Sequence, residues 1–449
     1  MKISIPDNAK IILNKLKQNN FEAFIVGGCV RDSVFGLIPH DWDICTSAEP
    51  EQIKNCFEDF NTFDTGIKHG TISVVINKEI FEVTTYRIDG EYSDNRHPES
   101  VTFTKNIEKD LARRDFTVNA MAYNDDRGIV DPFGGMDDLQ NKLIRCVGNP
   151  DERFNEDALR IMRALRFASC YSFSIEQATV ISIHKNAALL NNIAAERIRE
   201  ELIRLICGAG AEQILNDYRD VFAVFIPELT KCFDFEQHNI HHKYDVFRHI
   251  THSVAVAENL LLLRMTMLLH DIGKPFVCRK DPDGTCHFKG HQQISADMAE
   301  VILKRLRFPS SFIENCLKLI IYHDVRFDGS KKQVKRVLNK LGEENTRLLF
   351  KIQYADTMAQ SEYQRDEKLA KINTAKEIFE EIIAENQCFN LKQLAINGND
   401  LKAIGINNGV QIGRILNQLL EEVIDDEIKN EKSALLSKAK TIYNSNIEK

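Results

Sequence analysis

Two aspartates early in the chain have the spacing that metal-dependent phosphoryl chemistry requires. Asp41 and Asp43 stand at i and i+2, so on an extended segment both carboxylates project from one face while Trp42 points to the other. Carboxylate oxygens are the ligands that Mg²⁺ prefers, and two ions held this way would activate a hydroxyl nucleophile and stabilise a pyrophosphate leaving group. Because a lone pair of this kind is more often solvated or capping than catalytic, the neighbouring residues decide its meaning.

A glycine-rich turn precedes the two aspartates. It lies in VGGCVRD, from Val26 to Asp32, directly after a short apolar run. Gly27 and Gly28 would let the backbone come close to a phosphate, and Arg31 offers a forked cation to it. Each signal is weak alone, but the turn and the aspartates together favour a phosphate-handling site.

A third pattern, EDALRIMRALRF, places a carboxylate and guanidinium groups at helical spacing. Asp157 and Arg160 stand at i and i+3, and Arg163 follows one turn later, so a helix would align them on one face. A carboxylate accepts hydrogen bonds and a guanidinium donates them, which matches the Watson–Crick edges of cytosine and adenine but not those of uracil and guanine. The alternative is an ordinary surface ion pair.

The elements that must position these residues change along the chain. Residues 1 to about 135 contain short β-rich runs bounded by Gly, Asn or Pro, at 24–26, 72–76, 80–86 and 101–103. From about residue 155 onward, helical patterns dominate to the C-terminus. This predicts a mixed α/β head that carries the aspartates, followed by an all-helical remainder.

Composition sets the limits of the interpretation. The 449 residues allow roughly three domains, and 43% hydrophobic with 28% charged residues is ordinary globular composition. The net charge of −8 excludes a global positive field, so any contact with nucleic acid must be local. Eleven cysteines without a CxxC pair indicate reduced, buried thiols. The apolar run 260–269 is too short for a membrane span, and the first residues lack a signal-peptide core, so we expect a cytoplasmic, soluble protein.

Five motifs in order carry a resemblance to a known family. They are GGCVRD with DWD, IKHGTISV (67–74), RRDFTVNAMAY (113–123), DPFGG (131–135) and EDALRIMRALRF (156–167). The set resembles the motifs of bacterial class II tRNA nucleotidyltransferases, which include CCA-adding enzymes and their poly(A) polymerase relatives within the polymerase-β-type superfamily. The resemblance covers roughly the first 210 residues.

The resemblance implies a role for each matching residue. Asp41 and Asp43 would be the catalytic, Mg²⁺-binding pair; Gly27, Gly28 and Arg31 would hold the triphosphate; Arg114 and Asp115, with Asn119 nearby, would contact sugar and phosphates; and Asp157, Arg160 and Arg163 would select the base. Glu82, in IFEVTTY, is a weaker candidate for a third carboxylate, with an edge-strand surface charge as the alternative. The segment AAERIREEL (194–202) resembles a structural motif and receives no chemical role.

Three further segments are interpreted with the family in mind. The stretch 84–103 resembles the loop with which CCA-adding enzymes change from C to A, which CC-only enzymes lack. The segment 394–428 resembles the tail of Gram-positive-type CCA-adding enzymes, which is associated with gripping the tRNA elbow; ordinary helix caps are the alternative. The basic run 331–340 is either another phosphate contact or a solvated face.

A second resemblance lies in the helical half. The segments YDVFRHITHSV (244–254), LLHDIGKP (268–275) and YADTMA (354–359) resemble the HD-domain phosphohydrolase signature. Imidazoles and carboxylates from separate helices suit a transition metal that activates water for attack on a phosphoester. The implied ligands are His249, favoured over His252, with His270, Asp271 and Asp356, and with His291 and His323 as the extra histidines of a bimetallic site. A catalytically idle helical scaffold is the alternative.

We therefore expect an α+β multidomain protein. It would comprise a polymerase-β-type nucleotidyltransferase head (1–140), a helical neck with the nucleotide-selecting motif (141–225), an HD-type helical domain (226–375) and a helical, tRNA-binding tail (376–449). The resemblance implies Mg²⁺-dependent addition of CCA to the tRNA 3′ end from CTP and ATP, without a nucleic-acid template. The implied partners are the tRNA 3′ end and elbow, CTP and ATP, with no membrane; the oligomeric state stays open.

Several alternatives stay open at this stage. Within the family these are an A-adding enzyme and a poly(A) polymerase. Outside it, the main activity could be an HD-type phosphohydrolase acting on 2′,3′-cyclic phosphates or 2′-nucleotides, or the chain could be an RNA-binding module without catalysis.

Overall fold

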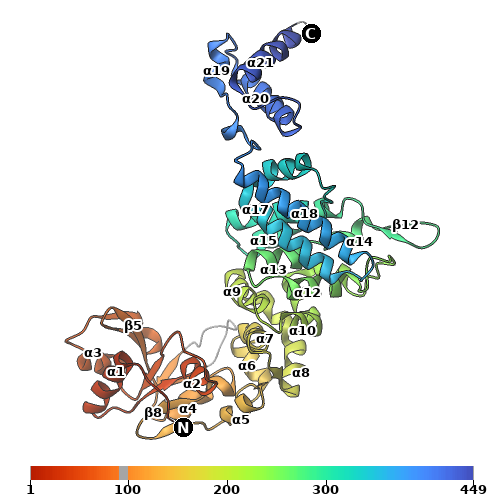
Figure 1. Cartoon of the computed structure of the whole chain (residues 1–449). Coiled ribbons are helices and arrows are strands. Elements are labelled where there is room, and N and C mark those ends of the chain that lie inside the picture. The colour runs from red at the N-terminus through yellow and green to blue at the C-terminus, as the bar shows by residue number, and fades with distance from the viewer. Residues whose placement is uncertain (1, 91–99, 448–449) are drawn as a thin grey trace. The chain divides into compact units, whose positions relative to one another are not determined.

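The computed structural model describes residues 2–90 and 100–447 (Figure 1). The chain divides into two compact units, Met1–Thr230 and Lys231–Lys449. Residues 91–99, which belong to the predicted C-to-A loop, lie outside the described part of the chain.

A seven-stranded mixed sheet forms the centre of the first unit. Its order is β3-β4-β5-β2-β1-β8-β9, and only the β2–β5 pair is parallel. The strands are β1 (Ala23–Val26), β2 (Ile44–Thr46), β3 (Thr62–Gly66), β4 (Thr71–Ile76), β5 (Glu79–Thr85), β8 (Ala122–Asn124) and β9 (Gly128–Val130). Strands β1 and β2 are buried at every position, as expected for strands in the middle of a covered sheet.

Short helices complete the head. They are α1 (Asp7–Gln18), α2 (Gly28–Val34), α3 (Pro50–Cys56), α4 (Ile107–Ala112) and α5 (Gly135–Gln140). A separate hairpin pairs β6 (Arg87–Asp89) with β7 (Val101–Phe103). Each of the four predicted β-rich runs contains a strand, so the predicted mixed head is confirmed.

Six helices follow the head within the first unit. They are α6 (Pro150–Glu156), α7 (Leu159–Tyr171), α8 (Gln177–Asn186), α9 (Ala195–Ile206), α10 (Ala211–Asp217) and α11 (Arg219–Phe225). The pattern EDALRIMRALRF is not one continuous helix, because Asp157 has extended backbone angles (φ −136°, ψ 102°) and separates α6 from α7. The predicted shared helix face of Asp157 and Arg160 is therefore wrong.

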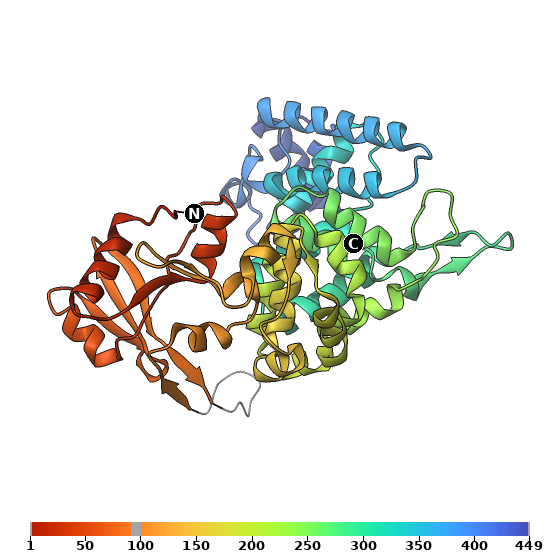
Figure 2. The ribbon, with the colours of Figure 1, turned by 90° about the horizontal axis from the view of Figure 1, so that it is seen from below.

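The second unit is helical apart from one short hairpin, β12 (Arg279–Lys280) with β13 (Cys286–His287). Its bundle contains α12 (Val246–Val256), α13 (Leu261–Leu269), α14 (Lys274–Val277), α15 (His291–Arg305), α16 (Ser310–Tyr322), α17 (Lys331–Ala359) and α18 (Arg365–Ala384). Figure 2 shows α17 and α18 running side by side, and these two helices pack against each other. The predicted helical remainder is confirmed.

Three C-terminal helices have an apolar core of their own. They are α19 (Gly398–Ala403), α20 (Gly409–Ile424) and α21 (Lys432–Ile447), and their core includes Leu401, Leu419 and Leu435. The basic run at the start of α17 faces this region: Lys332 and Arg336 pair with Asp425, and Lys335 pairs with Asp426. These three cations stabilise the fold, which argues against the predicted phosphate contact.

Two sequence-based expectations are borne out across the chain. All eleven cysteines are free thiols, and all except Cys170, Cys207 and Cys278 are buried. In the described residues, no helix is long and apolar enough to cross a membrane.

Candidate functional site

The carboxylates of the first site lie at the start of strand β2. The Val26 N–H donates to the Asp43 carbonyl at 3.0 Å, so the extended segment before β2 continues alongside β1. The parallel register pairs Ile44 with Val83, which places Glu82 of β5 beside Asp43. β5 is an inner strand, so Glu82 is not an edge-strand residue, but its side chain is exposed.

The Asp41, Asp43 and Glu82 carboxylates concentrate negative charge at this point. Burial raises the pKa of Asp43, the Arg114 guanidinium lowers it, and the neighbouring Glu82 and Asp41 carboxylates raise it further, with a net upward shift. Among the described residues, no hydrogen bond or ion pair to the carboxylate groups of Asp41, Asp43 or Glu82 is present. An acidic site with this donor set fits a divalent cation.

Gly27 marks the closest approach of the glycine turn to Arg114. The residue precedes α2 with φ +78°, a conformation that favours glycine, and a Cβ built on it would lie 2.9 Å from Arg114 Nη1. Arg114 is held from the other side by Asp110, with Nη2 3.5 Å from the carboxylate. The turn therefore holds a guanidinium directly beside the acidic site.

A buried polar chain connects the other predicted nucleotide-binding residues. Arg31 Nη1 donates to Asn119 Oδ1 at 2.5 Å, and Asn119 Nδ2 donates to Asp115 Oδ1 at 3.1 Å. Arg163 binds Asp115 Oδ2 through Nε at 2.8 Å and Nη2 at 2.6 Å. Burial raises the pKa of Asp115, but Arg163 and the Asn119 hydrogen bond outweigh it and lower the pKa to about 2.

The predicted base-selecting residues lie on either side of the break between α6 and α7. Asp157 Oδ1 accepts from the Leu159 N–H at 3.1 Å and so caps α7. Arg160 is buried in the first turn of α7, and its Nη1 lies 2.6 Å from Glu156 Oε2. Because each has a different partner, the structure contains no Asp157–Arg160 ion pair, and the surface-pair interpretation is wrong.

Helix α9 supplies two residues that the sequence prediction missed. Arg197 Nη2 lies 3.4 Å from Asp157 Oδ2, and its Nη1 is buried without a hydrogen-bond partner. Glu201 lies 2.5 Å from Arg166 Nε and 3.9 Å from Arg163 Nη1. The charge-rich sequence AERIREE on an amphipathic helix is the signal that could have identified both.

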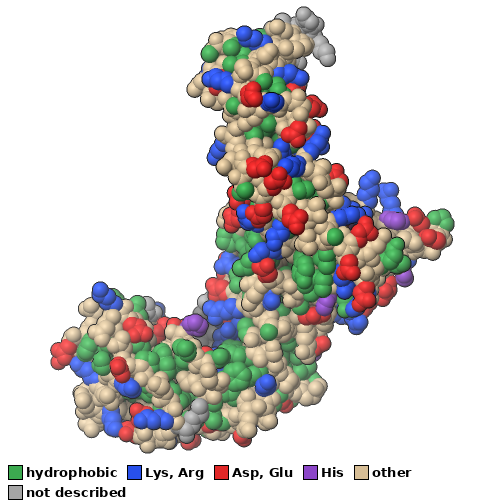
Figure 3. All heavy atoms as spheres, in the orientation of Figure 1, with side chains coloured by type: hydrophobic (Ala, Val, Ile, Leu, Met, Phe, Trp, Pro, Cys, Tyr) green, Lys and Arg blue, Asp and Glu red, His purple; other side chains and the backbone are tan. Residues whose placement is uncertain are grey.

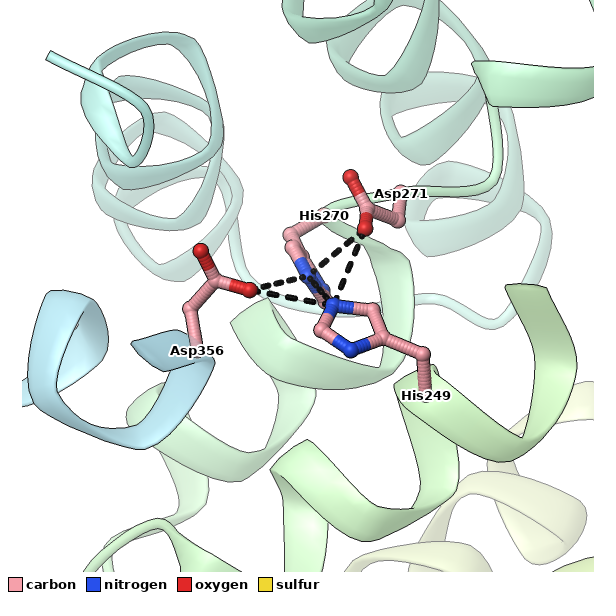
Figure 4. Close-up of side chains that lie close together, drawn as sticks. All are labelled: His249, His270, Asp271 and Asp356. Atoms are coloured by element: carbon pink, nitrogen blue, oxygen red, sulfur yellow. Dashed lines mark hydrogen bonds and ion pairs between the residues drawn. The ribbon is translucent and has the colours of Figure 1, made fainter. Parts of the chain in front are cut away.

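The second site lies in the other unit, where four predicted residues converge (Figure 4). His249 comes from α12, His270 and Asp271 follow α13, and Asp356 comes from α17. His249 Nε2 lies 3.0 Å from Asp356 Oδ1 and 3.2 Å from Asp271 Oδ2, and His270 Nε2 lies 3.2 Å from Asp271 Oδ2. The alternative His252 instead contacts the Tyr244 ring.

Asp271 joins this set to a second one. Its other oxygen, Oδ1, lies 3.2 Å from His291 Nε2 and 3.6 Å from His323 Nε2. The two imidazoles come from the start of α15 and the residue after α16, and both are buried. One buried carboxylate thus has one oxygen in each of two possible ligand sets.

The tautomers of the histidines test whether a cation fits. Three Nδ1 atoms lie beside backbone carbonyls, that of His270 at 2.7 Å, His291 at 2.8 Å and His323 at 2.6 Å. A carbonyl only accepts, so each of these Nδ1 atoms donates a proton, and Nε2 is the ring atom left to contact a cation. The Nε2 atoms lie beside neighbouring imidazole nitrogens, with His249–His270 at 3.3 Å and His291–His323 at 3.2 Å. This arrangement fits a shared cation.

The electrostatics of the cluster agree with that interpretation. Burial lowers the pKa of both His249 and His270, yet the carboxylates of Asp271 and Asp356 outweigh it and shift both pKa values upward. Burial raises the pKa of Asp271, but His270 and Lys274 hold it well below its usual value. Lys274 supplies positive charge to Asp271, and a metal ion would supply more between Asp271 and Asp356.

An open cavity of about 790 Å³ gives access to this cluster. Asp271, His291, His323 and Asp356 line it, together with Lys274, whose Nζ lies 2.6 Å from Asp271 Oδ2. Its volume lies in the range of pockets that hold small organic ligands. The cluster can therefore be reached by a substrate.

Comparison with known proteins gives consistent matches along the chain. Three family models match: "Poly A polymerase head domain" over residues 23–145, "Probable RNA and SrmB-binding site of polymerase A" over 172–233 and "tRNA nucleotidyltransferase domain 2 putative" over 288–439. The head is therefore of the polymerase-β type that the motifs predicted.

Individual relatives match over the whole length. The CCA-adding enzyme of Ligilactobacillus salivarius is 33% identical over 452 residues, with 98% of each chain covered. The crystal structure of the Bacillus stearothermophilus CCA-adding enzyme in complex with CTP superimposes with a TM-score of 0.72 at 26% identity, covering 98% of each chain. The Thermotoga maritima CCA-adding enzyme complexed with tRNA shares the fold, with a TM-score of 0.60 at 18% identity over 99% of this chain and 100% of that one.

Proposed function

This chain belongs to the family of CCA-adding enzymes, and from this premise we propose that it adds C, C and A to the 3′ end of tRNA from CTP and ATP. The observation that carries the proposal is the group of carboxylates Asp41, Asp43 and Glu82 beside Gly27 and Arg114. A cytoplasmic location follows from the tRNA substrate.

The head residues would bind and orient the nucleotide. Nucleotidyltransferases of this family use a divalent metal, generally Mg²⁺, and Asp41 and Asp43 would hold it; when bound, it supplies activation of the 3′-hydroxyl and charge stabilisation at the phosphates. Arg31, Arg114 and the Gly27–Gly28 backbone would bind the triphosphate. The buried Asp115–Asn119–Arg31 chain keeps Arg31 in place before the nucleotide arrives.

Base selection would use the break between α6 and α7. Asp157 accepts the amino group that cytosine and adenine share, and Arg160 donates to the neighbouring ring nitrogen. Arg197 orients Asp157 through their 3.4 Å contact. When a nucleotide binds, the Arg160 guanidinium leaves Glu156 and contacts the base. Between turnovers it stays paired with Glu156.

The decisive experiment measures incorporation of labelled CTP and ATP, separately and together, into tRNA that lacks the whole CCA end. Two C residues followed by one A are expected, and an Asp41→Ala variant should incorporate neither. Addition of A alone, and only to tRNA that already ends in CC, would identify an A-adding enzyme. A long A tail without a requirement for CTP would identify a poly(A) polymerase.

A specific observation supports a second activity, that of a metal-dependent phosphohydrolase of the HD type. Two ligand sets share Asp271, and both open into the 790 Å³ cavity. His249, His270, Asp271 and Asp356 would hold one transition-metal ion, and Asp271, His291 and His323 a second. Bound ions would supply a water nucleophile for a phosphoester such as a 2′,3′-cyclic phosphate or a 2′-nucleotide.

Separate variants distinguish the two activities. Phosphoester hydrolysis should survive Asp41→Ala and vanish in Asp271→Ala, whereas nucleotide incorporation should do the opposite. If no phosphoester is hydrolysed by the metal-loaded wild type, the helical domain is a scaffold and only the first activity stands.

The remaining parts of the chain receive roles on the same basis. The predicted boundary at residue 375 falls inside α18, which packs against α17, so the helical domain extends to the end of α18 at Ala384. We propose a four-part division at residues 140, 225 and 384, with the tail of α19–α21 binding the tRNA elbow. Asn397 and Asn408 cap α19 and α20 through their own side chains. A tail truncation should raise the KM for tRNA and leave the KM for CTP unchanged.

A further inference from the structure

The cavity that opens onto the histidine cluster carries a second group of residues, which are cationic. Arg326 and Lys368 line it, together with His241. None of them belongs to either ligand set. Their role is therefore not explained by metal binding.

These groups lie close together although their charges repel. Lys368 Nζ is 3.3 Å from His241 Nδ1. Burial lowers the pKa of His241, and the charges of Lys368 and Arg326 lower it further. Burial and Arg326 also lower the pKa of Lys368, although the Asp356 carboxylate acts in the opposite direction. Among the described residues, no carboxylate lies within ion-pair distance of Arg326 or Lys368. Asp356 and Asp324 attract Lys368 only at longer range. Such a concentration of donors without a direct ion-pair partner fits an anion.

The neighbouring Lys371 provides a comparison, because it forms an ion pair with a carboxylate. Lys371, one turn further along α18, also lines the cavity, but its Nζ lies 2.7 Å from Glu367. Lys368 instead contacts two neutral groups, Gln360 Oε1 at 2.6 Å and His241 Nδ1 at 3.3 Å. Lys368 therefore has no carboxylate in direct contact, whereas Lys371 does.

Gln360 links the cationic group to the histidine cluster. Its Nε2 donates to Asp356 Oδ2 at 2.9 Å, while its Oε1 accepts from Lys368. The ammonium group is thus one amide away from a carboxylate of the first ligand set. Both groups line the same cavity, whose volume lies in the range of pockets that hold a ligand of nucleotide size.

We propose that Arg326, Lys368 and His241 form a subsite for a second, unreacted phosphate of the substrate. The inference rests on the proposed phosphohydrolase and specifies its substrate class: a nucleotide whose 2′ or cyclic phosphate reacts at the histidine cluster while its 5′-phosphate binds the subsite. Both the last nucleotide of an RNA and a free nucleoside bisphosphate have this chemistry.

The test compares two ligands that differ only in the second phosphate. Binding of adenosine 2′-monophosphate and of adenosine 2′,5′-bisphosphate to the full chain is measured by titration calorimetry at equal ionic strength, after chelation of metal ions so that neither ligand is hydrolysed. The bisphosphate should bind about tenfold more tightly to the wild type, because charge-assisted hydrogen bonds are added. Equal affinity for the two ligands would overturn the proposal.

Variants assign that preference to the subsite. Lys368→Met and Arg326→Met should each reduce the preference for the bisphosphate over the monophosphate to less than about threefold. The affinity for the monophosphate should change little. The matched control Lys371→Met should retain the preference, since its charge is already neutralised. A preference that persists in both Lys368→Met and Arg326→Met would refute the subsite; melting curves verify that the variants are folded, and Lys368→Gln provides a polar replacement.

The outcome is separable from that of the proposed phosphohydrolase. A bisphosphate preference that depends on Lys368, without hydrolysis of either ligand, supports the subsite and contradicts the hydrolase. Hydrolysis of both ligands with equal KM supports the hydrolase and contradicts the subsite. A trinucleotide that ends in a 2′-phosphate distinguishes the two sources: binding as tight as that of the bisphosphate indicates RNA ends, and weaker binding indicates free nucleotides.

Discussion

Carboxylates serve the two sites in opposite surroundings. The Asp41 and Asp43 side chains reach solvent just before strand β2, although the surrounding head desolvates Asp43 enough to raise its pKa, whereas Asp271 is 1% exposed and enclosed by imidazoles. In the proposed functions, an ion at Asp41 and Asp43 would exchange with solvent and could arrive together with a nucleotide. An ion bound to Asp271 among the histidines would leave only when the cluster opens.

Replacing one carboxylate of the head tests the proposed role of Asp41 and Asp43. Asp43→Asn should lower the single-turnover rate of CMP incorporation by about a thousandfold, because the variant loses a charge that holds the divalent ion. Rapid-quench measurement with labelled CTP checks this. Glu58→Gln, which changes an exposed carboxylate of the same unit, should incorporate at the wild-type rate. Similar rates for Asp43→Asn and wild type would contradict the assignment.

The buried Asp115 gives a pH-dependent prediction. Its pKa is lowered to about 2, so the ionised form stabilises the folded state above the unfolded pKa, and this stabilisation is lost as pH falls toward 2. Asp115→Asn should therefore lower the free energy of unfolding by about 2 kcal/mol at pH 7, and the difference from wild type should become smaller below pH 4. Urea denaturation of both proteins at pH 7, 4 and 3 measures this difference. A difference that does not change with pH would contradict the ion-pair origin.

Among the elements, the break between α6 and α7 matters most for specificity. A continuous helix would point Asp157 and Arg160 along one face, but the extended backbone at Asp157 lets its carboxylate cap α7 and face Arg197 of α9. Two helices and one loop therefore fix the base-selecting group. Specificity should depend on α9 although α9 need not touch the base.

Arg197→Met tests this support. Without the guanidinium, Asp157 loses its 3.4 Å partner, and discrimination between CTP and UTP, measured as the ratio of kcat/KM values, should fall about tenfold. The exposed Arg204 on the same helix provides the control, since Arg204→Met should preserve the ratio. If Arg197→Met lowers both kcat/KM values equally, the residue supports activity without supporting selection.

These elements also show how far the sequence alone could predict the structure. The strands of the head follow from short β-rich runs between turn residues, and Asp41, Asp43 and Gly27 could be picked out because their chemistry is local. The extended Asp157 could not, because helical periodicity continues through it. Arg197 and Arg326 were missed because their partners are 40 or more positions away in the sequence or lie in another helix.

In the molecule as a whole, the two candidate sites belong to different compact units, Met1–Thr230 and Lys231–Lys449. Each unit contains all the residues of its own site, so neither chemistry needs side chains from the other. On the face shown in Figure 3, acidic and basic side chains are interspersed. Because the net charge of the chain is −8, the proposed contact with tRNA should depend on local groups.

Metal analysis of the intact protein tests whether the site in the helical unit is independent of the site in the head. After gel filtration, the wild type should retain close to two transition-metal ions per chain, and Asp271→Asn should retain close to none, because that carboxylate serves both ligand sets. Mass spectrometry of the metal content measures this, and nucleotide incorporation by Asp271→Asn should continue at the wild-type rate when Mg²⁺ is present. Asp41→Asn, the control in the other unit, should keep its transition metals.

The shared carboxylate of Asp271 has a thermodynamic consequence. One oxygen faces His249 and His270, and the other faces His291 and His323, so the first ion to bind fixes the rotamer that the second ion needs. In the proposed metal-loaded form, the two binding equilibria would be linked through this one carboxylate. The first ion would fix the side-chain rotamer for the second while its charge would repel it, so metal uptake by the helical unit would depart from two independent binding steps.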